Sequence, residues 1–170
     1  MSELQAFRKT KDEFIRNDPQ SPLDHSQKES FNGLKYYPES QELRFDLALE
    51  KVKEPEQINM ATSTGDKQEY IHAGQIRFRV QGQEAILQVY VSASGNDYFI
   101  PFVDATAPDE TYGAGRYLEP NDLGAGRLHV DFNLAYNPYC AYNDRWSCPL
   151  PPSVNRIKVR IEAGEKKLHK

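Results

Sequence analysis

The chain contains 170 residues, of which 38% are hydrophobic and 27% are charged, and its formal net charge is −4 with a pI near 5.6. This length predicts a single domain over residues 1–170 with a substantial core. An acidic chain lacks the basic face that a phosphate backbone requires, so we expect no nucleic-acid partner. No window approaches the roughly twenty apolar residues of a membrane helix, and the N-terminus shows no apolar signal segment. We therefore expect a soluble, cytoplasmic protein with no membrane partner and with reduced cysteines.

Residues 3–16 are predicted to form one amphipathic helix. Ser2 and Gln5 have the spacing of an N-terminal capping box. A second, short helical turn could begin at Ser21-Pro22 and end near Gly33. The first helix is expected to cover an open end or edge of a sheet. The hydrophobic side chains that fall near one stripe of this helix are Leu4, Phe7, Phe14 and Ile15.

From residue 43 onward, hydrophobic and polar side chains alternate with the period of two that is typical of half-buried strands. Gln81-Gly82 predicts a hairpin turn, and Pro101 indicates an edge or irregular strand. The pattern lacks βαβ alternation and predicts a mainly β fold, an antiparallel sandwich or barrel-like roll with one N-terminal α-helix. The β-rich core should extend over about residues 43–162. The predicted strands are residues 43–49, 76–80, 85–91, 98–103, 128–132 and 157–161.

A short glycine-rich sequence occurs twice, as Gly113-Ala114-Gly115-Arg116 and as Gly124-Ala125-Gly126-Arg127. Neither copy completes a phosphate-binding Gly-x-Gly-x-x-Gly motif, because Leu118 and His129 occupy the third glycine position. Glu119-Pro120-Asn121-Asp122 lies between the copies and is typical of a turn. We therefore predict a hairpin around this turn, whose strands begin with bulges or with a close approach of the backbone.

The segment 136–149 concentrates aromatic residues and both cysteines of the chain. It is too rich in Pro and Asn for a regular element and too aromatic for a solvated linker. An ordered loop of this kind is a common place for binding or chemistry. Its aromatic side chains could stack on a sugar, a base or a flat cofactor, or could cap a small core. They are Tyr136, Tyr139, Tyr142 and Trp146.

Cys140 and Cys148 allow several interpretations. Structural zinc requires four ligands, usually in close pairs, and the chain offers no second pair, so we expect no metal. A disulfide would close the loop between the two residues. Cys140 could also act as a nucleophile, with His129 as a conceivable base. Two buried free thiols that pack beside Trp146 are the favoured interpretation.

Three carboxylates, Glu110, Asp131 and Glu165, lie close to Gly, Asn or Tyr in the sequence. With nearby arginines they could bind a polar ligand or perform acid–base chemistry. Bidentate arginine–carboxylate pairs that fix loops onto a sheet explain the same residues without a substrate. Asp131 faces away from the apolar side of its predicted strand, toward either a polar pocket or solvent. The possible arginine partners are Arg116, Arg127, Arg145 and Arg156.

Several motifs occur in an order that resembles a known family. Phe31-Asn32-Gly33-Leu34-Lys35-Tyr36-Tyr37 is followed by Thr62-Ser63-Thr64-Gly65-Asp66 and by the stretch from Glu110 to Tyr117. Asp131-Phe132-Asn133 then leads into the Tyr-Asn-Pro-Tyr-Cys segment, and Asn155-Arg156 precedes Ala163-Gly164-Glu165. The chain resembles, over nearly its full length, the bacterial and archaeal family called domain of unknown function 1684. The resemblance implies a stand-alone domain of this length, but no established reaction and no functional residues.

We predict a pocket built by the loops near residues 110–116, 131–142 and 155–156. Its first predicted role is to hold a small polar molecule over an aromatic floor, as a ligand-binding module. A small hydrolase that uses Asp131 or Glu110 as a base or Cys140 as a nucleophile is an alternative, as is a structural or protein-interaction domain. The identity of any cofactor and the oligomeric state stay open. The candidate ligand-binding residues are Glu110, Tyr112, Arg116, Asp131, Asn133, Tyr136, Asn137, Cys140, Tyr142, Asn155 and Arg156.

Overall fold

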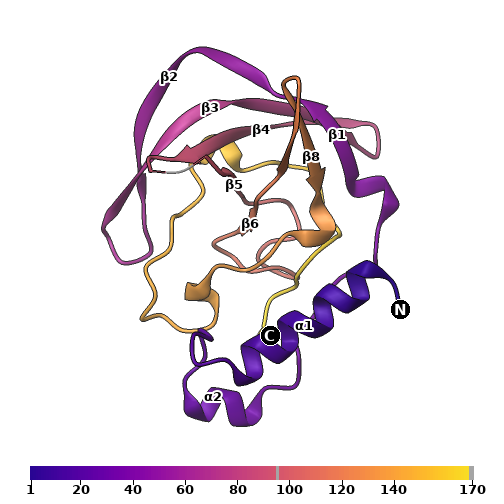
Figure 1. Cartoon of the computed structure of the whole chain (residues 1–170), viewed down its shortest axis with the longest axis vertical. Coiled ribbons are helices and arrows are strands. Elements are labelled where there is room, and N and C mark those ends of the chain that lie inside the picture. The colour runs from indigo at the N-terminus through magenta and orange to yellow at the C-terminus, as the bar shows by residue number, and fades with distance from the viewer. Residues whose placement is uncertain (95, 169–170) are drawn as a thin grey trace.

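Two antiparallel β-sheets form one end of the molecule, and two helices with long loops close the opposite end (Figure 1). The structure is a computed structural model and describes residues 1–94 and 96–168. The larger sheet contains, in spatial order, β2 (Glu50–Ala61), β3 (Lys67–Val80), β4 (Gln83–Ser92), β5 (Tyr98–Phe102) and β6 (Arg116–Leu118). The smaller sheet has the order β1 (Arg44–Ala48), β8 (Arg127–Asp131) and β7 (Asn121–Gly124).

The mainly β, antiparallel fold with an N-terminal helix is confirmed. Its described strands form a sandwich-like pair of sheets and not a closed barrel. The core lies where the alternating apolar side chains of the two sheets meet, and Phe132 packs edge-on against Phe45 and Phe102 within it. Removal of this apolar surface from water is the main stabilising contribution, at about 25 cal/mol per Å². The fully buried aliphatic members include Ile76, Leu87, Val89, Ile100, Leu128 and Val130.

Helix α1 (Glu3–Asn17) agrees with the predicted helix to within one residue at its C-terminal end. The capping box is present, since the Ser2 side chain accepts from the backbone of Gln5 and the Gln5 side chain accepts from that of Ser2. Leu4 and Ile15 are buried, whereas Phe7 remains 48% exposed. The second helical segment is α2 (His25–Ser30), which has its own capping box at Asp24. Short 3₁₀ turns occur at Gln41–Leu43, Phe132–Leu134, Tyr139–Ala141 and Ser153–Asn155.

The predicted last strand, residues 157–161, is wrong. This segment has no regular strand pairing, although its alternating side chains Val159 and Ile161 are buried in the core. Single hydrogen bonds replace a strand ladder here. The Ile161 amide donates to the Asp104 carboxylate, and the Val159 carbonyl accepts from the Ala105 amide. Apolar alternation here reflects packing of an irregular chain against a sheet. The sequence did not predict the long strand β2, because Met60 is its only buried residue and the strand therefore lacks apolar alternation.

The predicted hairpin around residues 119–122 is also wrong. Strand β6 pairs with β5 and strand β7 with β8, so the chain crosses from one sheet to the other at this turn. The actual hairpin joins β7 to β8 through Ala125 and Gly126, whose φ angles are +54° and +74°. The first glycine motif, residues 113–116, instead allows a close approach between two segments of backbone. A Cβ atom at Gly115, where φ is +101°, would lie 2.5 Å from the Phe102 carbonyl oxygen, so only glycine permits this approach.

Candidate functional site

Arg116 lies in the interior, where its side chain is 1% exposed. Its guanidinium donates to the carbonyl oxygens of Ile161 (3.0 Å), Ala163 (2.5 Å) and Glu165 (3.1 Å), and to the Asp104 carboxylate at 3.3 Å. Burial lowers the pKa of Arg116, which the neighbouring carboxylate of Asp104 opposes. Only Nε lacks a partner among the described residues. This candidate ligand-binding residue therefore ties the C-terminal segment to strand β6.

Three candidate asparagines replace missing strand pairing with side-chain hydrogen bonds. Asn155 accepts from the Gln88 amide at 2.8 Å and donates to the carbonyls of Gln88 (3.0 Å) and Pro101 (2.8 Å). Asn133 exchanges two hydrogen bonds of 2.8 Å with the backbone of Ser40. In each case a side-chain amide satisfies backbone groups that no strand reaches.

The third asparagine, Asn137, donates from Nδ2 to the Lys166 carbonyl at 3.0 Å. All three asparagines are at most 2% exposed. Their hydrogen bonds to backbone make them cross-links between separate segments, although Oδ1 of Asn137 has no hydrogen-bond partner among the described residues.

The carboxylates Glu110 and Asp131 are paired with arginines at separate places. Asp131 accepts from Arg44 Nε at 3.1 Å. Glu110 accepts from the Tyr37 hydroxyl at 2.7 Å and from Arg160. The hydrogen bond from Tyr37, followed by that from Arg160, lowers the pKa of Glu110. Neither carboxylate is therefore arranged as a free base.

The candidate residues are distributed over several places and do not line one pocket. Asp131 lines a cavity of about 520 Å³ beside the start of α1, together with Arg44 and His129. Arg156 lines a different cavity of about 660 Å³, near Pro151. Tyr142 is buried in the small apolar cluster beneath the helices, and its hydroxyl has no hydrogen-bond partner among the residues that the structure describes.

A continuous row of rings crosses from the larger sheet to the C-terminal segment. Tyr70 of β3 stacks on Phe99 of β5, with ring centroids 5.2 Å apart and planes inclined by 19°. Phe99 then meets Tyr117 of β6 edge-on at 4.8 Å, and Tyr117 meets Tyr136 edge-on at 5.8 Å. Tyr117 and Tyr136 are placed side by side by two backbone hydrogen bonds, of 2.8 and 3.0 Å. We call these four residues the aromatic row.

Charged groups stand at the Tyr136 end of the aromatic row. Lys11 places its ammonium 4.9 Å from the centre of the Tyr136 ring and forms an ion pair with Glu165. Glu165 is 2% exposed, and its other oxygen accepts from the Asn137 amide at 2.9 Å. Glu119 is exposed and accepts a hydrogen bond from the Tyr136 hydroxyl. Burial, and then this bond to a carboxylate, raises the pKa of Tyr136, so its hydroxyl stays a donor at neutral pH.

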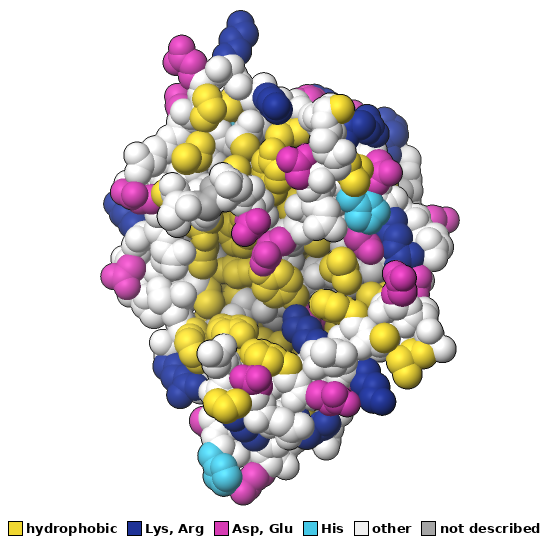
Figure 2. Space-filling view, viewed as in Figure 1, with side chains coloured by type: hydrophobic (Ala, Val, Ile, Leu, Met, Phe, Trp, Pro, Cys, Tyr) yellow, Lys and Arg dark blue, Asp and Glu magenta, His cyan; other side chains and the backbone are white. Residues whose placement is uncertain are grey.

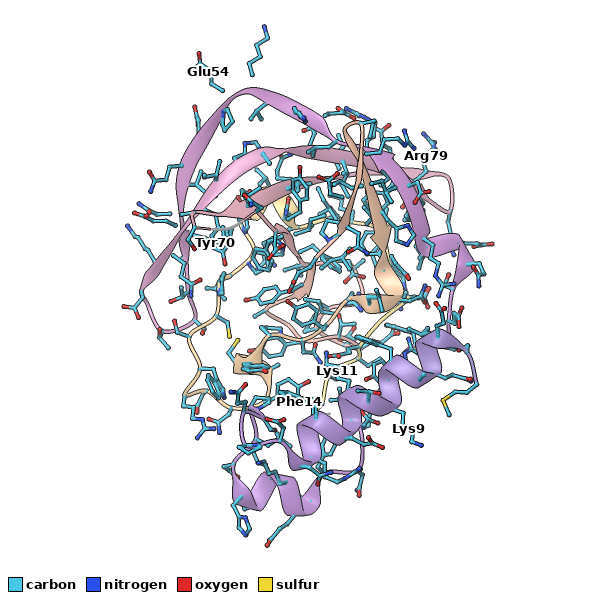
Figure 3. The ribbon with its side chains drawn as sticks, viewed as in Figure 1. Lys9, Lys11, Phe14, Glu54, Tyr70 and Arg79 are labelled. Carbon is cyan, nitrogen blue, oxygen red and sulfur yellow. The ribbon has the colours of Figure 1, made fainter. Side chains whose placement is uncertain are left out.

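This side of the molecule is hollowed. Figure 2 shows hydrophobic side chains gathered on the floor of the hollow, with acidic and basic side chains among them. Figure 3 shows Lys11 pointing from α1 into the space between helix and sheets, with Tyr70 on the sheet side of that space. Tyr70 and Lys11 stand at opposite ends of the aromatic row, so the row runs from the sheet side of this space to its helix side.

The two cysteines are free and lie beside the row. The Cys140 amide donates to Cys148 Sγ at 3.2 Å, and the Tyr112 hydroxyl donates to Cys140 Sγ at 3.7 Å. The charges of both thiols contribute to the raised pKa of Tyr117, after the larger effect of its burial. His129 instead binds Asp46 on β1 at 2.7 Å, so the pairing of Cys140 with His129 that the sequence suggested is not formed.

The structure thus brings Tyr112 into contact with Cys140 and places Tyr136 in the aromatic row. Sequence reasoning missed the other members of this group, which come from elements far apart in the chain. One signal was available for Lys11, because it follows the buried Leu4 by seven residues and precedes the buried Ile15 by four, which places it on the inward face of α1. The missed members are Lys11, Ser63, Tyr70, Phe99, Tyr117 and Glu119.

Comparisons with known proteins place this fold in a family. The family model described as "Protein of unknown function (DUF1684)" matches residues 29–166. The chain belongs to this family. No curated protein matches the chain.

A protein of similar fold has been solved. The solution NMR structure of an uncharacterized protein of Haloarcula marismortui is 34% identical to this chain, with a TM-score of 0.74. The match covers 96% of this chain and 92% of the other. The similar structure therefore supports the fold over nearly the whole chain, and neither comparison names an activity.

Two further observations concern metals and membranes. In the part of the chain that the structure describes, no three His, Cys, Asp or Glu side chains gather so that they could hold a metal ion. None of the helices within residues 1–94 and 96–168 is long and apolar enough to cross a membrane.

Proposed function

We propose that this DUF1684 protein is a ligand-binding module whose site is the hollow above the aromatic row. The observation that carries this proposal is the row itself, with Tyr70, Phe99 and Tyr136 all partly exposed. A soluble domain gains stability by burying such rings, and a row left open to solvent offers a flat apolar surface to a ring-bearing molecule. Apolar floors with a few polar groups at one end are typical of small-molecule sites.

The charges around the hollow favour one class of ligand. Lys11 and Glu165 compensate each other in an ion pair. Glu119 has no basic partner among the described residues and accepts only from Tyr136. Aromatic ring faces also attract cations. The ligand is therefore a small molecule with a flat ring and a positively charged or hydrogen-bond-donating group that reaches Glu119.

The carboxylate version of the hydrolase alternative receives less support. Glu110 and Asp131 are each engaged by an arginine, Arg160 and Arg44 respectively. A general base needs a carboxylate that is free to accept a proton near neutral pH, and the lowered pKa of Glu110 works against that role.

Three probes with the same phenol ring and different charges test the proposal. Tyramine, 4-hydroxybenzamide and 4-hydroxybenzoate carry positive, zero and negative charge, and each is titrated by isothermal calorimetry. We expect tyramine to bind most tightly and 4-hydroxybenzoate most weakly. Glu119→Gln should weaken tyramine binding about fivefold, the effect of about 1 kcal/mol for one exposed charge pair.

The matched control is Glu54→Gln. Glu54 is an exposed residue of β2 on the outer side of the larger sheet, away from the hollow (Figure 3). This substitution makes the same change of net charge and should leave tyramine binding unchanged. Phe99→Leu should weaken the binding of all three probes together, because it removes one of the two inner rings of the row and keeps most of the side-chain volume. Equal affinities of the wild type and Phe99→Leu for every probe would refute the site.

A further inference from the structure

The loop that contains the two cysteines returns on itself so that they meet. Cys140 lies in the 3₁₀ turn Tyr139–Ala141, and its amide donates to Cys148 Sγ at 3.2 Å. Cys148 is anchored to the turn between β2 and β3, because its amide donates to Ser63 Oγ at 3.1 Å and its carbonyl accepts from the Ser63 amide at 2.9 Å. Backbone hydrogen bonds on both residues therefore hold Cys148 Sγ against the Cys140 amide.

The surroundings of the two thiols differ. Cys148 is 6% exposed, whereas Cys140 is partly exposed. Cys140 Sγ accepts from the Tyr112 hydroxyl at 3.7 Å. Burial raises the pKa of Tyr112 to about 12, so this hydroxyl keeps its proton and remains a donor. A sulfur atom that accepts hydrogen bonds and reaches solvent is suited to the thiolate form.

Protonation is divided unequally within the pair. A hydrogen bond from the Cys148 thiol, assisted by the hydroxyls of Tyr112 and Ser63, lowers the pKa of Cys140 to about 6 against the opposing effect of burial. The same bond, with burial, raises the pKa of Cys148. These opposite shifts favour a thiolate at the accessible Cys140 and a protonated thiol at Cys148 near neutral pH. A nucleophilic and a resolving cysteine require this arrangement.

We propose that Cys140 and Cys148 form a peroxide-reactive dithiol that reduces a hydroperoxide and closes to an intramolecular disulfide. The Cys140 thiolate attacks the terminal oxygen of the hydroperoxide, the O–O bond breaks, and the departing alkoxide or hydroxide takes a proton. Cys140 becomes a sulfenic acid. The Cys148 thiol then loses its proton and attacks the Cys140 sulfur, the S–O bond breaks, and the hydroxide leaves with that proton as water.

The electrons balance in these two steps. The hydroperoxide gains two electrons and yields one alcohol, or one water from hydrogen peroxide, plus the water of the second step. The two thiols lose two electrons and become one disulfide. The step goes beyond the proposed ligand binding and does not rest on it, because none of its residues belongs to the aromatic row. Oxidation would convert the sulfur that accepts from the Tyr112 hydroxyl from a charged thiolate into a weaker, neutral disulfide acceptor.

The test treats the intact, folded protein with hydrogen peroxide and follows its mass. Wild type should lose the mass of two hydrogen atoms, and peptide mapping should place a Cys140–Cys148 cross-link in a monomer. Cys148→Ser should instead gain one oxygen atom at Cys140 and become reactive toward dimedone, and Cys140→Ser should not react. A cross-link that forms only after unfolding, or only between two chains, would overturn the proposal.

The pH dependence gives a readout that mere proximity of two thiols would not produce. The rate for wild type should change little between pH 7 and pH 8, whereas that of free glutathione should rise about eightfold with its thiolate fraction. Tyr112→Phe, which removes one hydrogen bond to the thiolate, should move the midpoint of the wild-type profile to higher pH. A wild-type rate that climbs in parallel with glutathione would contradict the assignment of Cys140 as the thiolate.

Discussion

The sheet end and the loop end of the molecule differ in what fills their interiors. Between the sheets, fully buried side chains such as Ile76, Leu87 and Val130 make up a continuous apolar core. Where irregular segments pack against the strands and helices, the buried groups include Arg116, Asn155 and Glu165, each bonded to backbone or to an opposite charge. A sheet satisfies its own backbone, so its side chains can be apolar, whereas irregular loops need polar side chains as partners.

This difference changes how a polar cluster in a sequence should be interpreted. Arg, Asn and carboxylate residues in loops suggest a binding site, yet Arg116, Asn133 and Asn155 here form structural cross-links. The polar groups left for a ligand are those at the rim of the aromatic row, above all Glu119. The following predictions test the comparison, beginning with the largest expected effect.

Arg116→Met should destabilise the protein most. The substitution removes a charge whose side chain is 1% exposed and leaves the buried Asp104 carboxylate without its partner. Breaking a buried pair in this way costs about 3–5 kcal/mol. Urea denaturation followed by circular dichroism measures the loss.

The matched control is Arg79→Met, on the outer side of the sheet (Figure 3), where the side chain is exposed and donates only to the Gly82 carbonyl. A change within about 0.5 kcal/mol is expected there. Similar losses for both substitutions would mean that Arg116 does not hold the loop end together.

Asn155→Ala should have the second largest effect. It removes three hydrogen bonds and leaves the Gln88 amide and the Pro101 carbonyl without their side-chain partner in a buried region. We expect a loss of about 2–3 kcal/mol, the range for orphaned buried polar groups. The control Asn59→Ala changes an exposed residue of β2 and should be nearly neutral. An unchanged free energy of unfolding in Asn155→Ala would show that this side chain does not replace strand pairing.

Glu110 should give the smallest effect, visible as a pH dependence. Its folded pKa lies below the ordinary value of 4.5, because Tyr37 and Arg160 bind the charged form. The carboxylate therefore stabilises the fold above that value, and the contribution is lost as the pH falls through the folded pKa. The Tm of wild type should exceed that of Glu110→Gln slightly at pH 7, and the difference should disappear in strong acid. Glu54→Gln, at an exposed position, should show no such convergence.

An element could be predicted from the sequence when the spacing of its apolar residues matched their burial. Strand β4 was found because its alternating apolar residues Ala85, Leu87 and Val89 are also the buried ones. Helix α1 was found from its apolar spacing and its capping box, although Phe7 of the predicted stripe is exposed. Residues 157–161 alternate in the same way, but Asp104 and Ala105 supply single hydrogen bonds where a strand would supply a ladder. Local periodicity cannot distinguish these two cases, because the difference lies in residues some fifty positions away.

The site was predictable only in part. Tyr112, Tyr136 and Cys140 were among the candidates because the C-terminal loop is dense in aromatic and polar residues. Tyr70 and Phe99 were not, since each looks like an ordinary strand residue. Their contact depends on the register of β3, β4 and β5, which places distant residues on one face of the sheet.

Chemical-shift mapping with tyramine tests the central claim most directly. Backbone amide signals are recorded while tyramine is added to the folded protein. Our account predicts shifts at the aromatic row and at Lys11 and Glu119, around the hollow. Shifts confined instead to the cavity beside Arg44 and Asp131, or to the one beside Arg156, would contradict it.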